Sequence, residues 1–265
     1  MNANKLMILA AAVALAAVAA VTTSLRAADK PAAPAAKEPI LTIGRAMLLA
    51  DYGGGKVCRI DKAGKVTWEM PAPGTQDIWM LPDGNVLYTY NKGVRIATPD
   101  KKVVWEYKTD KANEIHACQP LKDGKVMIAE SGPMRIVEVD RDLKIVKEVK
   151  LTTTCKNTHG QMRNARKLDT GNYLVGQVSE GILREYDPTG KIVRDIRQNN
   201  AFGGLRLAPN GNLIVANWGG HGHIGQQPQV FEVSRDAQKK VVGVIHDDVH
   251  FKTISGIFVL DEQGK

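Results

Sequence analysis

The feature that most constrains the fold of this chain is a short turn that recurs at a nearly constant spacing. In "MLPDGNVLYTY" a turn built on Asp and Gly leads into an apolar segment, and the pattern returns in "PLKDGKVMI", "KLDTGNYLVG" and "RLAPNGNLIVA". A degenerate copy, "VLDEQGK", occupies residues 259–265. The turn glycines are 40, 47, 40 and 53 residues apart, and they are Gly84, Gly124, Gly171, Gly211 and Gly264. Recurrence at this period is typical of repeat architectures.

A second landmark accompanies each turn. The segments "RIDKAGKVTWEM", "ATPDKKVVWEY", "VEVDRDLKIVKEV", "REYDPTGKIVRDI" and "FEVSRDAQKKVVGVI" each contain a short strand, a polar turn and a β-branched strand. One period therefore contains four short strands joined by tight turns. Four antiparallel strands in about 40 to 50 residues form the blade of a β-propeller, so an all-β propeller is predicted.

The number of blades follows from the spacing of the turns. Residues 41–265 accommodate five blades, with six as the alternative. The chain begins in the middle of a blade, because "AMLLADYGGGKVCRIDKAGKVTWEM" supplies three strands with no turn-bearing strand before them. The missing strand is available in "TISGIFVLDEQGK", so we expect the C-terminal strand to pair with the N-terminal blade and close the ring. A chain that stops before a sixth blade is the alternative.

The N-terminal segment is not expected to belong to the propeller. Lys5 precedes an apolar run at residues 6–21, and the small-residue segment "SLRAADKPAAPAAKEP" follows. This pattern predicts a secretory signal peptide at residues 1–27, a flexible linker at 28–40 and a single propeller domain at 41–265. An uncleaved N-terminal membrane anchor is the alternative, and only then would the protein contact a membrane. The prediction is an exported protein, periplasmic or extracellular.

Charge and cysteine content add weaker constraints. Residues 1–27 carry Lys5 and Arg26 and no acid, so cleavage lowers the formal charge of +8 by two. A mildly basic chain suits anionic ligands, and we expect a monomer with no nucleic-acid partner. The three cysteines, Cys58, Cys118 and Cys155, have neither haem nor zinc spacing. We expect small buried strand residues, with a disulfide between the last two left open.

The polar turns carry a family resemblance. The pattern D-x-x-G-K-V-x-W at Asp61–Trp68, echoed at Asp100–Trp105 and in "DPTGKIV", resembles the tryptophan-docking repeat of PQQ-like (quinoprotein-type) β-propellers. "EIHACQPLKDGKVMI" and "RLAPNGNLIVAN" resemble the strands of arylsulfotransferase-type propellers. The likeness covers nearly all of residues 44–265 as a fold signature. Quinoprotein dehydrogenases are larger rings with an adjacent Cys-Cys pair, which this chain lacks, so no cofactor is expected, PQQ included.

The candidate site follows from propeller geometry. The first strand of each blade lines the central channel, and every blade supplies at least one polar or charged residue just before the recurrent turn. Clustered positive charge is costly unless an anion or a carboxylate offsets it, so we expect a channel mouth that attracts anions. A wet channel whose polar groups only tie the blades together is the alternative. The candidate ligand-binding residues are Gln76, Glu114, His116, Gln119, His159, Gln161, Arg163, Arg166, Arg206 and His250.

The glycine-rich segment "NWGGHGHIGQQPQ" contains the other two candidates. His221 and His223 would share a face of an extended strand and could meet at a metal. A clear third ligand is lacking, so we expect no metal site. The chain also contains no G-x-S-x-G elbow, P-loop or H-E-x-x-H motif.

Two function classes remain, and the sequence leaves open whether the protein is an enzyme. The favoured one is an exported propeller that binds a ligand, an anion in particular, or a protein partner at the channel face. The alternative is a transferase or hydrolase, which the resemblance to arylsulfotransferases implies. Its nucleophile or general base would be His116, His159 or His250, with Arg163 and Arg206 stabilising anionic charge. Binding is favoured because no catalytic motif is matched residue by residue.

Overall fold

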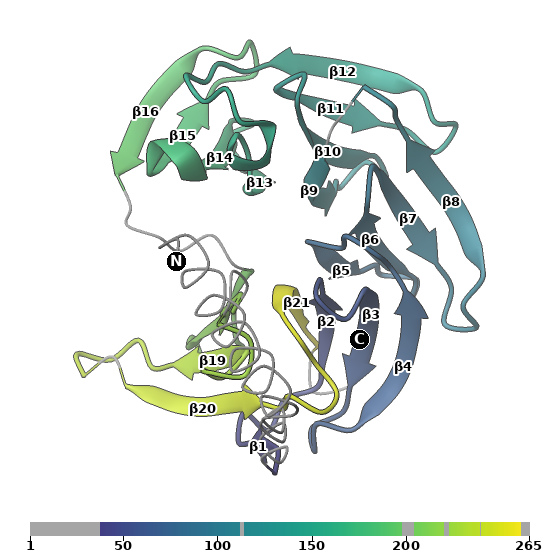
Figure 1. Ribbon diagram of the computed structural model, residues 1–265. Helices are drawn as coiled ribbons and strands as arrows, with labels where there is room; N and C mark the ends of the chain where they lie inside the picture. The colour runs from purple at the N-terminus through teal and green to yellow at the C-terminus, as the bar shows by residue number, and fades with distance from the viewer. Residues whose placement is uncertain (1–37, 112–113, 198–203, 220–222, 239, 261–265) are drawn as a thin grey trace, which may run out of the picture. The chain divides into compact units, whose positions relative to one another are not determined.

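The propeller is seen in a computed structural model, which describes residues 38–260 except 112–113, 198–203, 220–222 and 239. The described residues form five antiparallel sheets around a common centre (Figure 1). The predicted all-β class is confirmed, with five blades and not six. The predicted signal peptide at 1–27 lies outside the described residues, as does most of the predicted linker. Within the described part of the chain, no helix is long and apolar enough to span a membrane.

Each blade is described from its innermost strand outward. Blade 1 contains β21 (Ile254–Val259), β2 (Met47–Asp51), β3 (Lys56–Ile60) and β4 (Val66–Pro71). Blade 2 contains β5 (Ile78–Met80), β6 (Val86–Tyr90), β7 (Gly93–Ala97) and β8 (Val103–Lys108). Blade 3 contains β9 (Glu114–Pro120), β10 (Val126–Ser131), β11 (Arg135–Val139) and β12 (Ile145–Lys150).

The last two blades carry the remaining elements. Blade 4 contains β13 (Asn164–Lys167), β14 (Tyr173–Gln177), β15 (Ile182–Tyr186) and β16 (Ile192–Arg197). Blade 5 contains β17 (Leu205–Leu207), β18 (Leu213–Ala216), β19 (Val230–Val233) and β20 (Val241–His246), with β1 (Ile40–Leu41) as a fifth strand outside β20. Two short 3₁₀ helices flank blade 4, η2 (Thr158–Gly160) and η3 (Val178–Glu180).

The recurrent turn has the same structure in four blades. In blade 2 the Leu81 N–H donates to the Asn85 carbonyl at 2.8 Å, and the Gly84 N–H donates to the Leu81 carbonyl at 3.0 Å. The same pair of hydrogen bonds forms in blades 3, 4 and 5. Gly84 has a φ of 81°, which glycine adopts without steric cost. The turn therefore joins the innermost strand of each of these blades to the second strand.

The ring closes as predicted. β21 pairs antiparallel with β2, so that Met47 lies opposite Val259 and Leu49 opposite Ile257. The Ser255 hydroxyl lies within hydrogen-bond distance of two carbonyls, one in blade 1 and one at the start of blade 2. The strand β1 was not predicted, because residue 40 was assigned to the linker. It pairs with β20, with Ile40 opposite His246, and so the chain contacts blade 5 before it enters blade 1.

The apolar cores lie between neighbouring blades and not on the axis. Each contains buried side chains from two sheets, as in the pairs Leu48 and Tyr88, Ile96 and Ile128, Ile136 and Tyr173, and Leu49 and Ile214. Because the sheets bury both faces against one another, the sequences are apolar through most of the inner strands. The edge of each inner strand faces the axis of the ring, and side chains at this edge can be polar.

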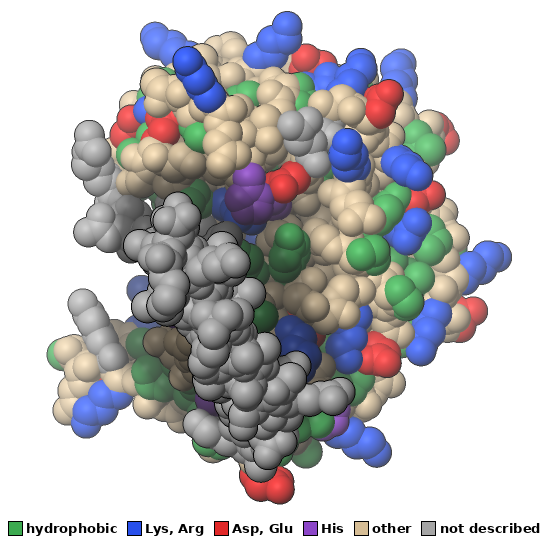
Figure 2. All heavy atoms as spheres, viewed as in Figure 1, with side chains coloured by type: hydrophobic (Ala, Val, Ile, Leu, Met, Phe, Trp, Pro, Cys, Tyr) green, Lys and Arg blue, Asp and Glu red, His purple; other side chains and the backbone are tan. Residues whose placement is uncertain are grey.

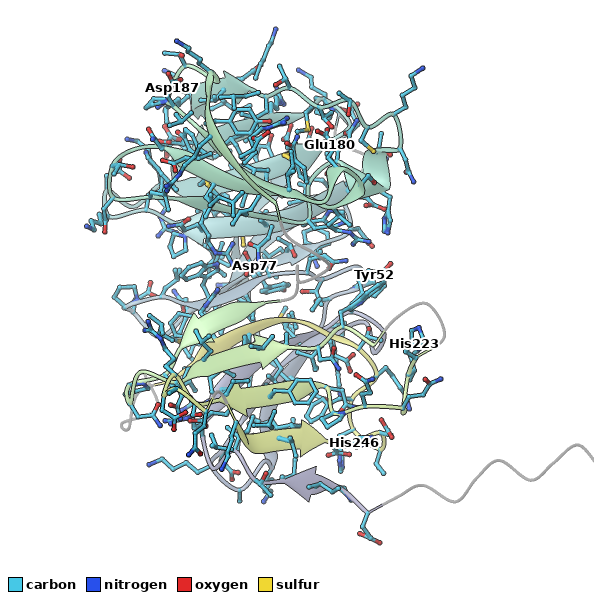
Figure 3. The ribbon with its side chains drawn as sticks, turned by 90° about the vertical axis from the view of Figure 1, so that its left-hand side faces the viewer. Tyr52, Asp77, Glu180, Asp187, His223 and His246 are labelled. Atoms are coloured by element: carbon cyan, nitrogen blue, oxygen red, sulfur yellow. The ribbon has the colours of Figure 1, made fainter. Side chains whose placement is uncertain are left out.

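The two faces of the ring are made by different connections. Because neighbouring strands are antiparallel, the recurrent turns and the outer turns project from one face, called here the turn face. The connections between blades project from the other, the loop face. Figure 3 shows Asp187 at the turn face, Tyr52, Glu180 and His223 at the loop face, and Asp77 between them. Each inner strand runs from the loop face to the turn face, so residues early in the strand lie nearer the loop face.

Candidate functional site

Polar residues occur at two repeated positions of the inner strands. Eight residues before the turn glycine stand Gln76, His116 and Arg163, near the loop face. Five residues before it stand Trp79, Gln119, Arg166 and Arg206, deeper in the ring. The fixed distance from the turn glycine is a signal in the sequence that marks both positions. It separates the candidate residues into two clusters.

The first group, called here the His–Glu cluster, consists of Glu114, His116, His159 and Arg163. Both Glu114 oxygens lie 2.8 to 2.9 Å from His159 Nδ1, and Oε2 also lies 2.8 Å from His116 Nε2. The guanidinium of Arg163 donates to His159 Nε2 and lies 3.4 Å from His116 Nε2. The two imidazole centroids are 5.8 Å apart. Figure 2 shows histidine and acidic side chains side by side on the face toward the viewer, near β13.

The two imidazoles are held by hydrogen bonds on both ring nitrogens. His159 donates through Nδ1 to Glu114 and accepts from Arg163 through Nε2. His116 donates through Nδ1 to the Met162 carbonyl at 2.5 Å, and its side chain is only 3% exposed. Burial lowers the pKa of His116. Its Nε2 points toward the Glu114 carboxylate.

Glu114 is held ionised by its two imidazole neighbours. Hydrogen bonds with His116 and then His159 lower the pKa of Glu114 to about 2. The three ligand-type atoms of Glu114, His116 and His159 lie within 4.8 Å of one another. The expectation of no metal site overlooked this group, because the sequence separates Glu114 from His159 by 45 residues.

The connection before β13 positions His159. The helix η2 is capped by the Asn157 side chain, which accepts from the His159 N–H at 3.1 Å. A Cβ at Gly160 would lie 1.7 Å from Ser179 Oγ and 3.0 Å from its Cβ, so a larger residue there would force the Ser179 side chain to move and crowd the contact between η2 and η3. The amide of Gln161 holds the same connection, donating to the Cys155 carbonyl at 3.2 Å and accepting from a backbone N–H of blade 3 at 2.8 Å.

Two aromatic residues of the loop face border the His–Glu cluster. The Arg163 guanidinium lies 5.5 Å from the Trp218 ring centroid, and Tyr52 meets Trp218 edge to face at 6.1 Å. Burial lowers the pKa of Arg163, but the group stays charged at neutral pH. The sequence analysis missed both aromatic residues, because they lie on connections that carry no repeated motif.

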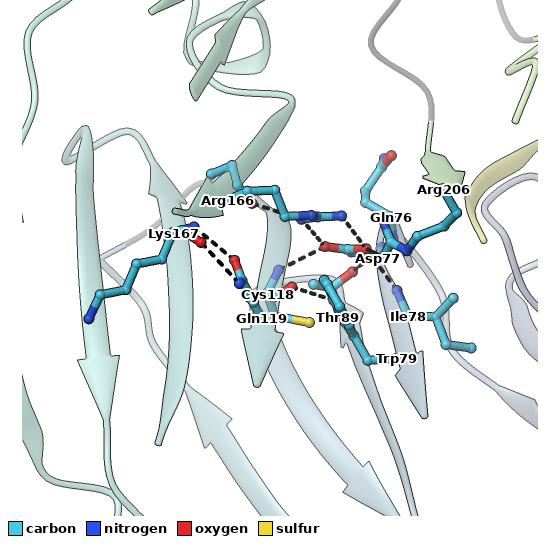
Figure 4. Close-up of polar contacts among 11 residues, drawn as sticks. Gln76, Asp77, Ile78, Trp79, Thr89, Cys118, Gln119, Arg166, Lys167 and Arg206 are labelled. Carbon is cyan, nitrogen blue, oxygen red and sulfur yellow. Dashed lines mark hydrogen bonds and ion pairs between the residues drawn. The ribbon is translucent and has the colours of Figure 1, made fainter. Parts of the chain in front are cut away.

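The second group, called here the Arg–Asp cluster, consists of Asp77, Arg166, Arg206 and Trp79. Arg166 donates to both Asp77 oxygens, at 2.7 and 3.0 Å, and Arg206 lies 3.6 Å from one of them. Figure 4 shows the two arginines pointing toward Asp77 from opposite sides. Both guanidinium carbons also lie over the Trp79 ring, 5.0 and 4.3 Å from its centroid. Trp79 donates to the Cys118 carbonyl at 2.6 Å, which fixes the ring in place.

The two arginine side chains are largely buried and close together, so their positive charges repel each other. Burial, and then the charge of Arg166, lower the pKa of Arg206 to about 10. The side chain of Arg206 is 15% exposed and that of Asp77 is 5% exposed. Asp77 joins blade 2 to blades 4 and 5, which are not its sequence neighbours. The cluster is therefore a charged contact across the ring.

The remaining glutamines and cysteines have other positions. Gln119 joins blade 3 to blade 4. Its side-chain oxygen accepts from the Lys167 N–H at 2.8 Å, and its side-chain nitrogen donates to the Lys167 carbonyl at 3.2 Å. Gln76 lies two residues before β5, where its N–H donates to the Thr89 hydroxyl at 2.8 Å. All three cysteines are free thiols, with Cys58 and Cys118 buried, so the disulfide between Cys118 and Cys155 does not form.

The structure does not bring His250 or His223 into either cluster. His250 donates through Nδ1 to Asp247 at 2.7 Å and packs near Phe251, with its side chain 56% exposed. His223 is exposed and lies 3.2 Å from the Gln226 amide oxygen. His221 lies outside the described residues.

Solved structures resemble this chain to different degrees. A protein of unknown function from Bacteroides caccae is 22% identical, with a TM-score of 0.73 over 83% of this chain and 100% of that one. This likeness shows the fold alone. Virginiamycin B lyase from Staphylococcus aureus is 14% identical, with a TM-score of 0.46 over 77% and 69% of the two chains. BamB from Moraxella catarrhalis is 15% identical, with a TM-score of 0.40 over 77% and 62%.

The sequence itself matches one family. No curated protein matches it. Residues 54–258, which span most of the propeller, match the Mal s 1 allergenic protein-like family. The propeller fold implied by the resemblance to quinoprotein-type proteins is confirmed, and the closer relation to them stays a prediction. The chain belongs to the Mal s 1 allergenic protein-like family.

Proposed function

We propose that this propeller binds an anionic small molecule in its channel, with Arg166 and Arg206 as the charged contacts. The observation that carries the proposal is the convergence of two guanidinium groups on one carboxylate, Asp77, inside the ring. The arginines come from blades 4 and 5 and the carboxylate from blade 2, so the arrangement exists only in the closed ring. It is therefore preorganised for a ligand.

The electrostatics favour an anion over a neutral ligand. Two guanidinium groups that repel each other in a buried position are stabilised by any anion that bridges them. The pKa of Arg206, lowered to about 10, still leaves it charged at neutral pH. Guanidinium groups bind carboxylate, sulfate and phosphate through two parallel N–H donors, so these are the chemical classes that the cluster suits.

Trp79 adds an apolar contact to the charged one. Both guanidinium planes lie over its ring, and its indole N–H is already used by the Cys118 carbonyl. Its remaining surface can contact only apolar or aromatic parts of a ligand. We therefore infer an anion attached to an apolar or aromatic body.

The test is thermal unfolding in sulfate and in chloride at equal ionic strength. Sulfate is kept at low millimolar concentration, where its general stabilising effect on proteins is small. The wild type should melt at a higher temperature in sulfate, because a ligand bound only to the folded state stabilises it. The double variant Arg166→Gln/Arg206→Gln should lose the sulfate-specific increase.

The control is Arg194→Gln on the outer strand β16, where the arginine is 63% exposed and pairs with Glu185. It removes a guanidinium outside the channel and should keep the sulfate-specific increase. Equal increases in the wild type and the double variant would contradict the proposal. The two single variants are measured as well, in case the double variant does not fold. Near-UV circular dichroism verifies the fold of each one.

The His–Glu cluster supports a second candidate, a transferase or hydrolase. Its His159 is oriented by a carboxylate, as a general base or nucleophile requires. However, its other nitrogen already accepts a hydrogen bond from Arg163, so the ring can react only after that guanidinium moves. Turnover of an aryl sulfate or phosphate ester that is lost in His159→Gln would favour this candidate over binding alone.

Export stays part of the proposal. It is supported by the apolar run at residues 6–21 and the small-residue segment after it. Sequencing the N-terminus of the purified native protein tests it. A mature N-terminus near residue 28 is expected, and an intact Met1 in a soluble fraction would contradict cleavage.

A further inference from the structure

The His–Glu cluster brings together three ligands of the kind found at open metal sites, two imidazoles and one carboxylate, although no sequence motif points to a site. We propose that Glu114, His116 and His159 bind a divalent transition metal ion, and that Zn²⁺ is the ion this ligand set suits best. Two imidazoles and one carboxylate are a common set at catalytic zinc sites. The proposal does not depend on anion binding at the Arg–Asp cluster.

The distances place the donors around one point. Their ligand atoms all lie within 4.8 Å of one another, and Glu114 Oε2 is 2.8 Å from a nitrogen of each ring. Zinc bonds of about 2.0 to 2.1 Å in tetrahedral geometry separate neighbouring ligand atoms by about 3.3 Å. The donors must therefore open by about half an ångström. Glu114 and His159 are 36% and 38% exposed, so both have room to adjust.

His116 is already oriented as a metal ligand. Its Nδ1–H donates to the Met162 carbonyl, which fixes the tautomer and directs the Nε2 lone pair toward Glu114. Metal-bound histidines characteristically donate their other ring N–H to such an acceptor. The Nε2 of His116 lies 2.8 Å from Glu114 Oε2, so these two candidate ligand atoms already face each other.

Arg163 should oppose metal binding. In the metal-free cluster His159 carries its proton on Nδ1, and its Nε2 accepts from Arg163. A metal at Nδ1 takes the lone pair there, so the ring proton moves to Nε2 and the guanidinium can no longer donate to it. Arg163 also places a positive charge 3.4 Å from His116 Nε2. Metal binding should therefore displace Arg163, and removing its charge should strengthen the site.

Three protein ligands leave one coordination position of a tetrahedral ion open. Such open sites bind water or a ligand group, whereas closed four-ligand sites are structural. The open position would lie at the loop face, beside Arg163 and Trp218. The ligand class that it would take is a small oxygen or nitrogen donor.

The experiment measures Zn²⁺ binding to the full chain without a histidine tag, after removal of metal with a chelator. Competition against a fluorescent zinc indicator gives the stoichiometry and Kd. The wild type should bind one Zn²⁺ per chain. Glu114→Gln and His159→Gln should weaken binding by about 100-fold or more, because each removes a direct ligand, and loss of an outer-shell partner alone costs about 10- to 100-fold. Arg163→Gln should strengthen binding by about tenfold.

The matched control is His250→Gln, which removes another exposed histidine that is paired with a carboxylate. It should leave the Kd unchanged. Tighter binding in Arg163→Gln would not arise if the cluster were only structural. Absence of stoichiometric binding in the wild type, or equal Kd values for the wild type, Glu114→Gln and His159→Gln, would overturn the proposal. Thermal unfolding of each metal-free variant verifies that it is folded.

Discussion

The His–Glu cluster and the Arg–Asp cluster lie at different levels of the ring and are built mostly from different blades. The first sets two imidazoles and one arginine around a carboxylate of blade 3. The second sets two arginines around a carboxylate that is 5% exposed. Blade 4 contributes to both, because Arg163 and Arg166 belong to the two clusters and are only three residues apart. For these two arginines, the position along the chain decides which cluster the side chain joins.

This comparison shows how a repeat protein can build two sites on one scaffold. Positions eight residues before the turn glycine lie near the loop face, where the neighbouring Glu114 and His159 side chains are partly exposed and can exchange partners. Positions five residues before it lie inside the ring, where Trp79 and Asp77 hold the guanidinium groups in place. We expect the outer level to accept cations and the inner level to accept anions.

The largest effect should follow from opening the ring, on which both clusters depend. A chain that ends at Lys252 lacks β21, which pairs with β2 and buries Ile254 and Ile257. The lost packing should cost more than about 5 kcal/mol, comparable with the stability of a whole domain. Urea unfolding and size-exclusion chromatography should show an unfolded or aggregated protein. An unchanged unfolding midpoint would contradict closure by this strand.

A second prediction separates the clusters by their dependence on a carboxylate. Asp77→Asn leaves two buried guanidinium groups without their anionic partner and should cost about 3 to 5 kcal/mol of unfolding free energy. Glu114→Gln should cost about 1 kcal/mol or less, because Glu114 is 36% exposed and water replaces its contacts. Urea titrations of both variants give the comparison. Equal losses would show that the two clusters are equally buried in solution.

A third prediction uses an ion pair outside the channel as a reference. Arg45 and a pair of asparagines lower the pKa of Glu232 to about 2, with the Arg45 hydrogen bond as the main cause. The folded state thus favours the ionised form relative to an unfolded value of about 4.3. The stabilisation is complete above that value and is lost as the pH falls toward 2.

The variant Glu232→Gln should therefore lose about 1 to 3 kcal/mol at pH 7 and show a weaker loss of stability in acid than the wild type. Glu69→Gln is the control, because Glu69 is 51% exposed and pairs with Lys56 at the surface. It should change the unfolding free energy by less than about 1 kcal/mol. The idea fails if the wild type and Glu232→Gln have the same acid dependence in urea titrations at pH 7 and pH 3.

The smallest effect is expected at the turn face between blades 3 and 4. Lys122 and Asp169 lie 3.1 Å apart there, but both side chains are 94% exposed. Lys122→Ala should change the unfolding free energy by less than about 0.5 kcal/mol. The same two blades carry the His–Glu cluster, so a larger loss would show that contact between them depends on surface charge more than on the apolar core.

Much of the fold could be predicted from the sequence because propeller blades are local structures. The turn at Gly84 and its repeats need one residue with positive φ, and this requirement is visible as glycine at a fixed period. Closure was predictable because a blade that lacks its first strand leaves an edge to be paired. The strand Ile40–Leu41 was not, because its pairing with β20 depends on where blade 5 ends in space.

The site was predictable only at the level of which strands carry it. The inner strands and most of their polar residues followed from the repeat. Partners did not, because Asp77 and Arg166 are 89 residues apart and come from blades that are not adjacent. His250 shows the same limit, since its orientation is set by Asp247 three residues before it and not by its place near the closing strand.

One measurement tests most directly the claim that the channel holds two separate sites. Zn²⁺ affinity and the sulfate-specific increase in melting temperature are measured for the wild type, Glu114→Gln and Arg166→Gln/Arg206→Gln. Glu114→Gln should lose Zn²⁺ affinity and keep the sulfate response, and the arginine variant should do the reverse. Loss of both responses in each variant would contradict two sites and indicate one coupled site, and loss of neither would leave the channel without the proposed binding residues.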